Sequence, residues 1–157
     1  MDRNSLESNK TANGRVNGGN THMAGEFFVA AELSKRGYQV AITMGNAKAV
    51  DLMVERDGTS ICIQVKAIAT KKSVGWPLPF KREKILNNVV YVCVVLNDLN
   101  QPPTYFILLP EDVCRHGDWY ETRAILCLGK IQGQEFENAW NTIDRFLENS
   151  SQVSASL

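Results

Sequence analysis

The segment over residues 50–67 constrains the fold of this chain most, because it predicts a β-hairpin with a defined register. Asp57-Gly58 is a dipeptide that favours the tight turn of a two-residue hairpin, and apolar and polar residues alternate on both sides of it. With these two residues in the turn, Asp51 lies directly across from Gln64. Side chains paired in this way have Cβ atoms roughly 4.5–5.5 Å apart.

One face of this hairpin gathers polar groups at its open end. Side chains alternate between the two faces of a strand, so Lys66 shares a face with Asp51 and Gln64, and we expect this face to be open to solvent. A carboxylate and an amide oxygen on adjacent strands can hold a hard divalent cation such as Mg²⁺. A lysine beside them can orient or activate a water that attacks a phosphodiester. The alternative is a hairpin with an ordinary polar, solvent-facing side.

A helix is predicted upstream of the hairpin, over residues 23–36. It ends at Gly37, a residue type that favours helix C-termini. Glu26 falls in the middle of the apolar arc of this helix, in line with Ala30 and Leu33. A carboxylate on an inward-facing stripe needs a reason, and the alternative is a glutamate in the frayed first turn, stabilised by the helix dipole.

The remaining pattern predicts an α/β fold with a central mixed sheet flanked by helices. Residues 38–44 are predicted to form a strand, and the continuous apolar run over 89–96 is typical of a strand buried on both faces. Residues 104–109 are expected to return as the next strand. An amphipathic helix is predicted over residues 134–147, whereas residues 68–88 are expected to be irregular because of their prolines.

The length of 157 residues fits a single domain with a proper core. Residues 1–22 are rich in small polar residues and cannot bury a core, so we expect a disordered N-terminal arm. Residues 149–157 form a similar polar tail. The domain is therefore expected to span residues 23–148.

Basic residues are concentrated between Lys66 and Lys84, although the formal net charge is zero. Zero net charge argues against a protein that coats nucleic acid non-specifically. A local excess directly after the polar cluster can instead hold a nucleic-acid backbone, while the alternative is a solvated loop. The residues predicted to contact the backbone are Lys71, Lys72, Lys81 and Arg82.

Several other classes of protein are excluded by composition and motif. No apolar run approaches the ~18 residues of a membrane span, and the polar first residues do not form a signal peptide. Four cysteines without metal spacing indicate reduced thiols, and we expect a cytoplasmic protein. With two histidines, of which His22 is expected in the disordered arm, a histidine-rich zinc site is not predicted. The aromatic residues that could stack on bases are more often core packing: Trp76, Tyr91, Tyr105 and Phe106.

The order of these residues resembles the signature of the PD-(D/E)XK nuclease superfamily, whose core is restriction-endonuclease-like. That signature is a glutamate on a helix, an aspartate at the start of a strand, and Glu-x-Lys on the next strand. The matching positions are Glu26, Asp51 and Gln64-Val65-Lys66. The resemblance covers about residues 23–109 and implies a metal-dependent DNA endonuclease.

The resemblance also implies roles for these residues. Asp51 and Gln64 would hold Mg²⁺ or Mn²⁺, helped by Glu26 and the Val65 carbonyl, and Lys66 would position or activate the water. Gln64 stands where the family usually has an acid, so a negative charge is lost and metal affinity should fall. Homing endonucleases of cyanobacterial group I introns and Holliday-junction resolvase-like proteins look similar in accepting glutamine here or in moving the carboxylate to the first helix.

The expected partner is DNA, and the expected assembly is a homodimer or homotetramer, since one active site per domain cannot cut both strands at once. The last helix or the strand that begins at Val89 could supply the interface, and the alternative is that both belong to the core. A second hypothesis keeps the fold but makes the protein a DNA-binding or interaction module, because the site is weakened at Gln64. A third is a structural α/β protein without a nucleic-acid role.

Overall fold

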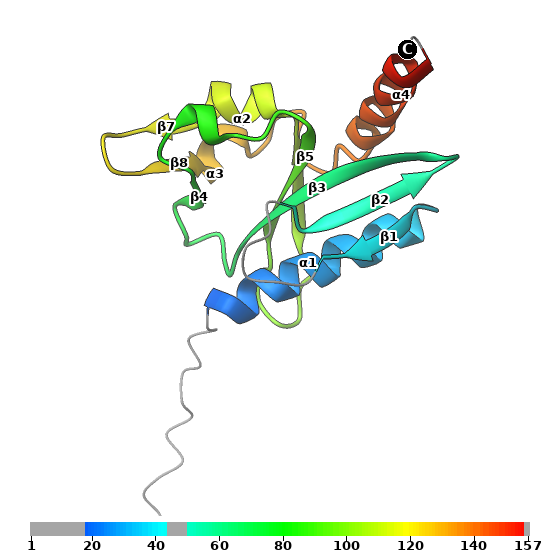
Figure 1. Ribbon diagram of the computed structural model, residues 1–157. Coiled ribbons are helices and arrows are strands. Elements are labelled where there is room, and N and C mark those ends of the chain that lie inside the picture. Colours follow the sequence, from blue (N-terminus) through cyan, green and yellow to red (C-terminus); the bar gives the residue numbers. More distant parts are fainter. Residues whose placement is uncertain (1–17, 44–49, 156–157) are drawn as a thin grey trace, which may run out of the picture.

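The computed structural model describes residues 18–43 and 50–155, with side chains up to residue 152 (Figure 1). Its elements follow in the order α1 (Gly18–Lys35), β1 (Gln39–Ile42), β2 (Leu52–Arg56), β3 (Thr59–Ile68), β4 (Gly75–Leu78), the 3₁₀ helix η1 (Arg82–Lys84), β5 (Val89–Val95), β6 (Thr104–Leu108), α2 (Pro110–His116), β7 (Asp118–Trp119), β8 (Ala124–Cys127), α3 (Leu128–Ile131) and α4 (Asn141–Ala155).

A five-stranded mixed sheet forms the centre of the fold, in the order β1-β2-β3-β5-β6. The β3–β5 pair is parallel and the other three pairs are antiparallel. All seven residues of β5 are buried, because helices cover one face of the sheet and further elements cover the other. The predicted α/β fold with a central mixed sheet is confirmed.

The two faces of the sheet are covered by different parts of the chain. On one face, α1 and α4 pack against the apolar side chains of β2, β3 and the even-numbered residues of β5. On the other face, α2, α3 and the smaller sheet pack against the odd-numbered residues of β5 (Figure 1). Because side chains alternate between the two faces of a strand, β5 contributes residues to both hydrophobic cores.

The hairpin of β2 and β3 has the predicted register. Leu52 pairs with Ile63 and Arg56 with Thr59, which leaves Asp57-Gly58 as the turn. Both turn residues have positive φ, 53° and 77°, as a type I′ turn requires. Glycine adopts this conformation at no steric cost, so the local sequence sets the register of the whole hairpin.

The helix ends differ from the predictions. The first helix begins at Gly18 rather than near Met23, so residues 18–22 belong to α1 and not to a disordered arm. Residues 1–17 of the predicted arm and residues 44–49 lie outside the described residues. The last helix begins at Asn141 rather than Gln134 and continues through most of the predicted tail, to Ala155. Tertiary contacts decide both ends, because Thr21 is buried and Thr59 hydrogen-bonds Ser151.

A second, three-stranded sheet occupies part of the segment predicted to be irregular. Its order is β4-β8-β7, so the strand that carries Pro77 lies at an edge, where proline is tolerated. Trp76 of β4 is buried, donates a hydrogen bond from Nε1 to the Val94 carbonyl at 3.1 Å and meets Phe106 edge-on. The four aromatic residues considered for base stacking are all buried in the core, so their role is packing.

Helix α4 is attached to the sheet by a polar network as well as by apolar packing. The Tyr38 hydroxyl and the Arg56 guanidinium both donate hydrogen bonds to Asp144 of α4. Burial of Tyr38 raises the pKa of its hydroxyl above the ordinary value, and the hydrogen bond to Asp144 acts in the same direction. The apolar stripe of α4 and the strand from Val89 are both buried in this core, so neither is open to serve as the expected subunit interface.

Candidate active site

The candidate site lies where α1 crosses the open end of the β2–β3 hairpin. The helix approaches β3 closely at Gly25, where an added Cβ would lie 2.5 Å from the Cβ of Ala67. A side chain at this position would push the two elements apart. Gly25 therefore lets the helix deliver the next residue, Glu26, to the carboxylate at the start of β2.

Asp51 is the centre of the site and is almost completely buried, with 1% of its surface exposed. Its Oδ2 accepts a hydrogen bond from Gln64 Nε2 at 2.7 Å and another from the Val65 backbone N–H at 2.8 Å. The predicted approach of Asp51 and Gln64 is confirmed. The expectation that this carboxylate faces solvent is wrong, because α1 lies across it.

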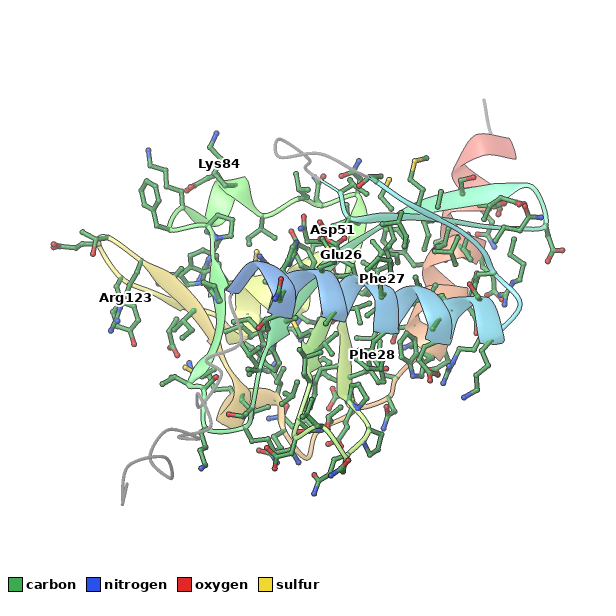
Figure 2. The ribbon with its side chains drawn as sticks, turned by 90° about the horizontal axis from the view of Figure 1, so that it is seen from below. Glu26, Phe27, Phe28, Asp51, Lys84 and Arg123 are labelled. Carbon is green, nitrogen blue, oxygen red and sulfur yellow. The ribbon has the colours of Figure 1, made fainter. Side chains whose placement is uncertain are left out.

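Glu26 is also buried, with 5% exposed, and lies in the interior of α1 rather than in a frayed first turn. Figure 2 shows it next to Asp51, seen from the side of the sheet that α1 covers. Two buried carboxylates this close repel one another unless a cation or a proton lies between them. The pair could therefore hold a cation between them.

His22 completes this cluster, and the sequence-based prediction missed it by assigning it to a disordered arm. Its Nε2 lies 2.8 Å from Glu26 Oε1 and 3.7 Å from Asp51 Oδ1, while 46% of the side chain is exposed. The spacing was the available signal, because residues four apart on a helix share a face. Because α1 begins at Gly18, His22 is helical and its side chain contacts Glu26.

These three side chains fit a divalent cation. One ligand atom from each of His22, Glu26 and Asp51 lies within 4.8 Å of the others. Two carboxylates and an imidazole form a donor set that suits Mg²⁺, Mn²⁺ and related ions. Gln64 adjoins the set, since its amide nitrogen is bound to Asp51 and its amide oxygen is the atom that can act as a ligand. The ligand role predicted for the Val65 carbonyl stays a prediction.

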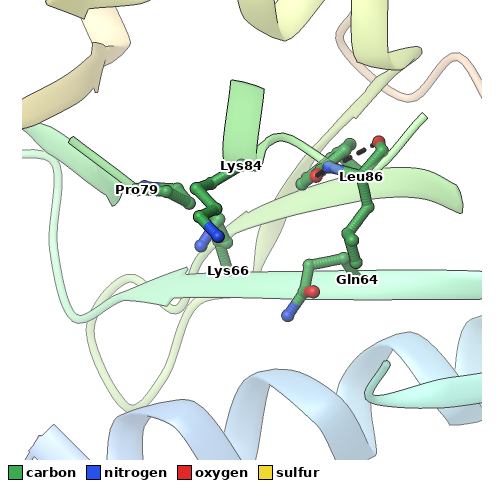
Figure 3. A pocket seen from close by; sticks show the side chains of 6 residues that line it. Gln64, Lys66, Pro79, Lys84 and Leu86 are labelled. Carbon is green, nitrogen blue, oxygen red and sulfur yellow. Dashed lines mark hydrogen bonds between the residues drawn. The ribbon is translucent and has the colours of Figure 1, made fainter. Parts of the chain in front are cut away.

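Lys66 lies on the other side of Gln64, in a cavity of 210 Å³ (Figure 3). The described residues that line this cavity are Gln64, Lys66, Pro79, Lys84, Leu86 and Tyr91. The site is thus divided into an acidic part under α1 and a basic cavity. Gln64 touches both, because its amide donates to Asp51 while its side chain forms part of the cavity wall.

The neighbour of Lys66 on the next strand, Cys93, does not add a nucleophile to the site. The two residues are paired in register across β3 and β5. Burial raises the pKa of the Cys93 thiol to about 12, with the Lys66 ammonium acting weakly in the opposite direction. Cys93 therefore remains a thiol at neutral pH and packs as part of the core.

The four basic residues predicted to contact a nucleic-acid backbone are all exposed. The guanidinium of Arg82 lies 5.3 Å from the Trp119 ring, and Lys81 Nζ lies 5.6 Å from the Phe80 ring. None of Lys71, Lys72, Lys81 and Arg82 is among the described residues that line the cavity. Their predicted contacts with DNA stay a prediction, and the lysine that lines the cavity together with Lys66 is Lys84.

Comparisons with known proteins found one matching family and a similar fold. Residues 20–94 match the model of the PD-(D/E)XK endonuclease family. Among solved structures, the chain is similar in fold to the bacterial homing endonuclease I-Ssp6803I, with a TM-score of 0.56 and 16% sequence identity over 88% of this chain and 97% of the other. No curated protein matches the chain.

Residues 20–94 are therefore PD-(D/E)XK nuclease-like, as the resemblance in the sequence implied, and the fold of the chain is similar to that of a homing endonuclease. In particular, the matched range contains the whole cluster, from His22 and Glu26 on α1 to Asp51 and the Gln64-Val65-Lys66 segment of β3. The restriction-endonuclease-like fold is confirmed by the mixed sheet and its structural neighbour.

Proposed function

We propose that this protein is a metal-dependent endonuclease that hydrolyses phosphodiester bonds in DNA. The observation that carries the proposal is the pair of buried carboxylates, Glu26 and Asp51, directly beside the cavity that contains Lys66. Burial of two carboxylates side by side is costly even with His22 and hydrogen-bond donors next to them, and natural proteins keep such costs mainly where function needs them. The match of residues 20–94 to an endonuclease family supports the same assignment.

The proposed cation is Mg²⁺ or Mn²⁺, held by Asp51, Glu26 and His22 with the amide oxygen of Gln64. Such a cation would polarise the phosphate and offset the negative charge that develops in the transition state. Gln64 holds the Asp51 carboxylate in one orientation through its amide nitrogen. Lys66 orients the attacking water or stabilises the charged phosphate oxygens, depending on which of them it meets.

The proposed substrate is double-stranded DNA, whose backbone would be held by the exposed basic residues that follow β3: Lys71, Lys72, Lys81 and Arg82. Cutting both strands requires two active sites, so we propose a homodimer or homotetramer. Phe27 and Phe28 are exposed on α1 and offer an apolar surface for that contact (Figure 2). Of the described helices, none is long and apolar enough to cross a membrane.

A second candidate is a nuclease fold that binds DNA without cutting it. The observation that favours it is Gln64, which supplies no negative charge where the related motif has an acid. Fewer charged ligands mean weaker cation binding. The two candidates share the DNA-binding surface and differ in the requirement for a cation.

The deciding experiment is incubation of the full chain with supercoiled plasmid and with branched DNA, with and without Mn²⁺ or Mg²⁺. We expect the parent to nick or linearise DNA only when the cation is present. We expect no cleavage by Lys66→Ala. Lys66→Ala should retain cation binding, because Lys66 lies outside the carboxylate cluster. DNA binding with no cleavage under any of these conditions would favour the second candidate.

A further inference from the structure

The cavity beside the carboxylates contains a second lysine to which the family signature assigns no role. Lys66 enters it from β3, and Lys84 enters it from the end of η1 (Figure 3). The two residues are eighteen positions apart in the chain. The fold of the segment between β4 and β5 brings both side chains to the lining of one cavity.

The segment that carries Lys84 is held in a defined position. The backbone N–H of Leu86 donates a hydrogen bond to the Tyr91 hydroxyl at 2.9 Å, which ties the segment to β5. The turn of η1 is closed by hydrogen bonds from Lys84 N to Lys81 O and from Ile85 N to Arg82 O, both 3.0 Å. Lys84 thus reaches the cavity from a fixed backbone rather than from a loose loop.

The charges of this cavity lack a counter-charge within it. Of the described residues in its lining, none is acidic, and the remaining lining is neutral or apolar. Two ammonium groups in one partly enclosed space repel each other and favour an anion between them. The nearest acid on the segment, Glu83, is exposed and is not part of the lining.

We propose that Lys66 and Lys84 together form a phosphate-binding site, and that Lys84 holds the scissile phosphodiester group against the carboxylate cluster. The cavity of 210 Å³ has room for more than a single water. Gln64 separates the cavity from Asp51 by one side chain, so a phosphate seated here lies next to the proposed cation ligands. This proposal rests on the proposed function for its substrate, whereas the anion site itself rests on the cavity.

This role differs from that of the other basic residues in the segment. Lys71, Lys72, Lys81 and Arg82 are exposed outside the cavity and would contribute to affinity for any stretch of backbone. Lys84 would act on the one phosphate that reacts. Its removal should therefore lower the rate of the chemical step far more than the affinity for DNA.

The first arm of the test measures anion binding without a cation. Inorganic phosphate is titrated into the full chain, and the NMR signals of the Gln64 side-chain amide and the Leu86 backbone amide are followed. Saturable shifts are expected in the parent and should disappear in Lys84→Ala and in Lys66→Ala. Lys35→Ala is the matched control, because Lys35 is exposed on α1 and pairs with Glu32.

The second arm measures single-turnover cleavage of duplex DNA with Mn²⁺. Lys84→Ala should lower the rate on the order of a hundredfold, with a change in DNA affinity of less than about threefold, and Lys84→Arg should restore part of the rate. If the parent cuts no DNA, the proposed function fails while the phosphate titration still tests the anion site. Phosphate shifts that persist in Lys84→Ala, or that are absent in the parent, would overturn the inference.

Discussion

Gln64 donates a hydrogen bond to the buried carboxylate of Asp51, with 2.7 Å between Nε2 and Oδ2. A glutamate at this position, as in the related motif, could not make this contact without a proton or a shared cation. Gln64 therefore stabilises the protein in the absence of metal. The same residue gives the proposed metal site one negative charge fewer than a glutamate would. This relationship sets the expectations for variants of both residues.

Asp51→Ala and Asp51→Asn should both abolish cation-dependent cleavage but differ in stability. Alanine leaves the buried Val65 N–H without its acceptor, whereas the asparagine oxygen can still accept from it. We expect Asp51→Ala to be less stable than Asp51→Asn by about 1–3 kcal/mol, the cost of an unsatisfied buried group. Denaturant unfolding of both variants without metal measures this difference, and equal stabilities would contradict the structural role of the carboxylate.

Gln64→Glu should raise Mn²⁺ affinity and lower stability in the absence of metal. The new carboxylate supplies a further charged ligand but faces Asp51 without a donor between them. Calorimetric titration and thermal unfolding, with and without Mn²⁺, test the two effects. Gln64→Met is the control, since methionine has a similar length but neither donates nor accepts hydrogen bonds strongly. This variant should show lower Mn²⁺ affinity and lower stability than the parent. Identical Mn²⁺ affinities in parent and Gln64→Glu would remove Gln64 from the site.

His22→Ala should weaken binding of Mn²⁺ more than binding of Mg²⁺. An imidazole nitrogen suits transition-metal ions, whereas Mg²⁺ prefers oxygen ligands and keeps its waters. His116→Ala is the matched control, because the other histidine packs edge-on against Phe136. Titrations of both ions into both variants provide the measurement. Equal losses for the two ions would mean that His22 acts only by holding Glu26.

Removal of the charges at Lys71, Lys72, Lys81 and Arg82 should weaken DNA binding about equally across sequences. For every phosphate group that is no longer neutralised, the plot of log affinity against log salt should flatten by roughly 0.9 for duplex DNA. Binding of the parent and the quadruple alanine variant is measured between low and moderate salt. A salt slope unchanged in the variant would show that these residues do not touch the backbone.

Alkaline pH should destabilise the parent more than Tyr38→Phe. The pKa of Tyr38 is raised in the folded protein, so the neutral hydroxyl stabilises the fold below the unfolded pKa of about 10. As pH rises above that value, the unfolded tyrosine releases its proton while the folded one retains it, and the contribution declines. Melting temperatures from about pH 9 to 11 should converge for the two proteins. Tyr120→Phe, at an exposed tyrosine, serves as the control.

Local sequence was sufficient for the elements whose determinants lie within one segment. The Asp57-Gly58 turn fixed the register of the hairpin, and with it the contact between Asp51 and Gln64. The unbroken apolar run of β5 predicted a strand buried on both faces. The order of these elements was also enough to indicate the family that residues 20–94 match.

Tertiary structure decided the features that join distant segments. The pairing of β4 with β8 connects residues that are roughly fifty positions apart, so no local pattern could reveal the second sheet. The early start of α1 depends on tertiary packing, such as the burial of Thr21. This packing places His22 on the helix and beside Glu26, rather than in a disordered arm.

The sequence by itself determined which groups could react: the carboxylates, the amide and Lys66, set on known elements by turn chemistry and alternation. Only the tertiary structure decided which of these groups lie in the buried carboxylate cluster and which line the basic cavity. Packing of α1 buries Asp51 with Glu26 and His22, while η1 carries Lys84 to the cavity of Lys66. The physical reason is that burial and charge convergence depend on which surfaces meet, and that information is spread over the whole chain.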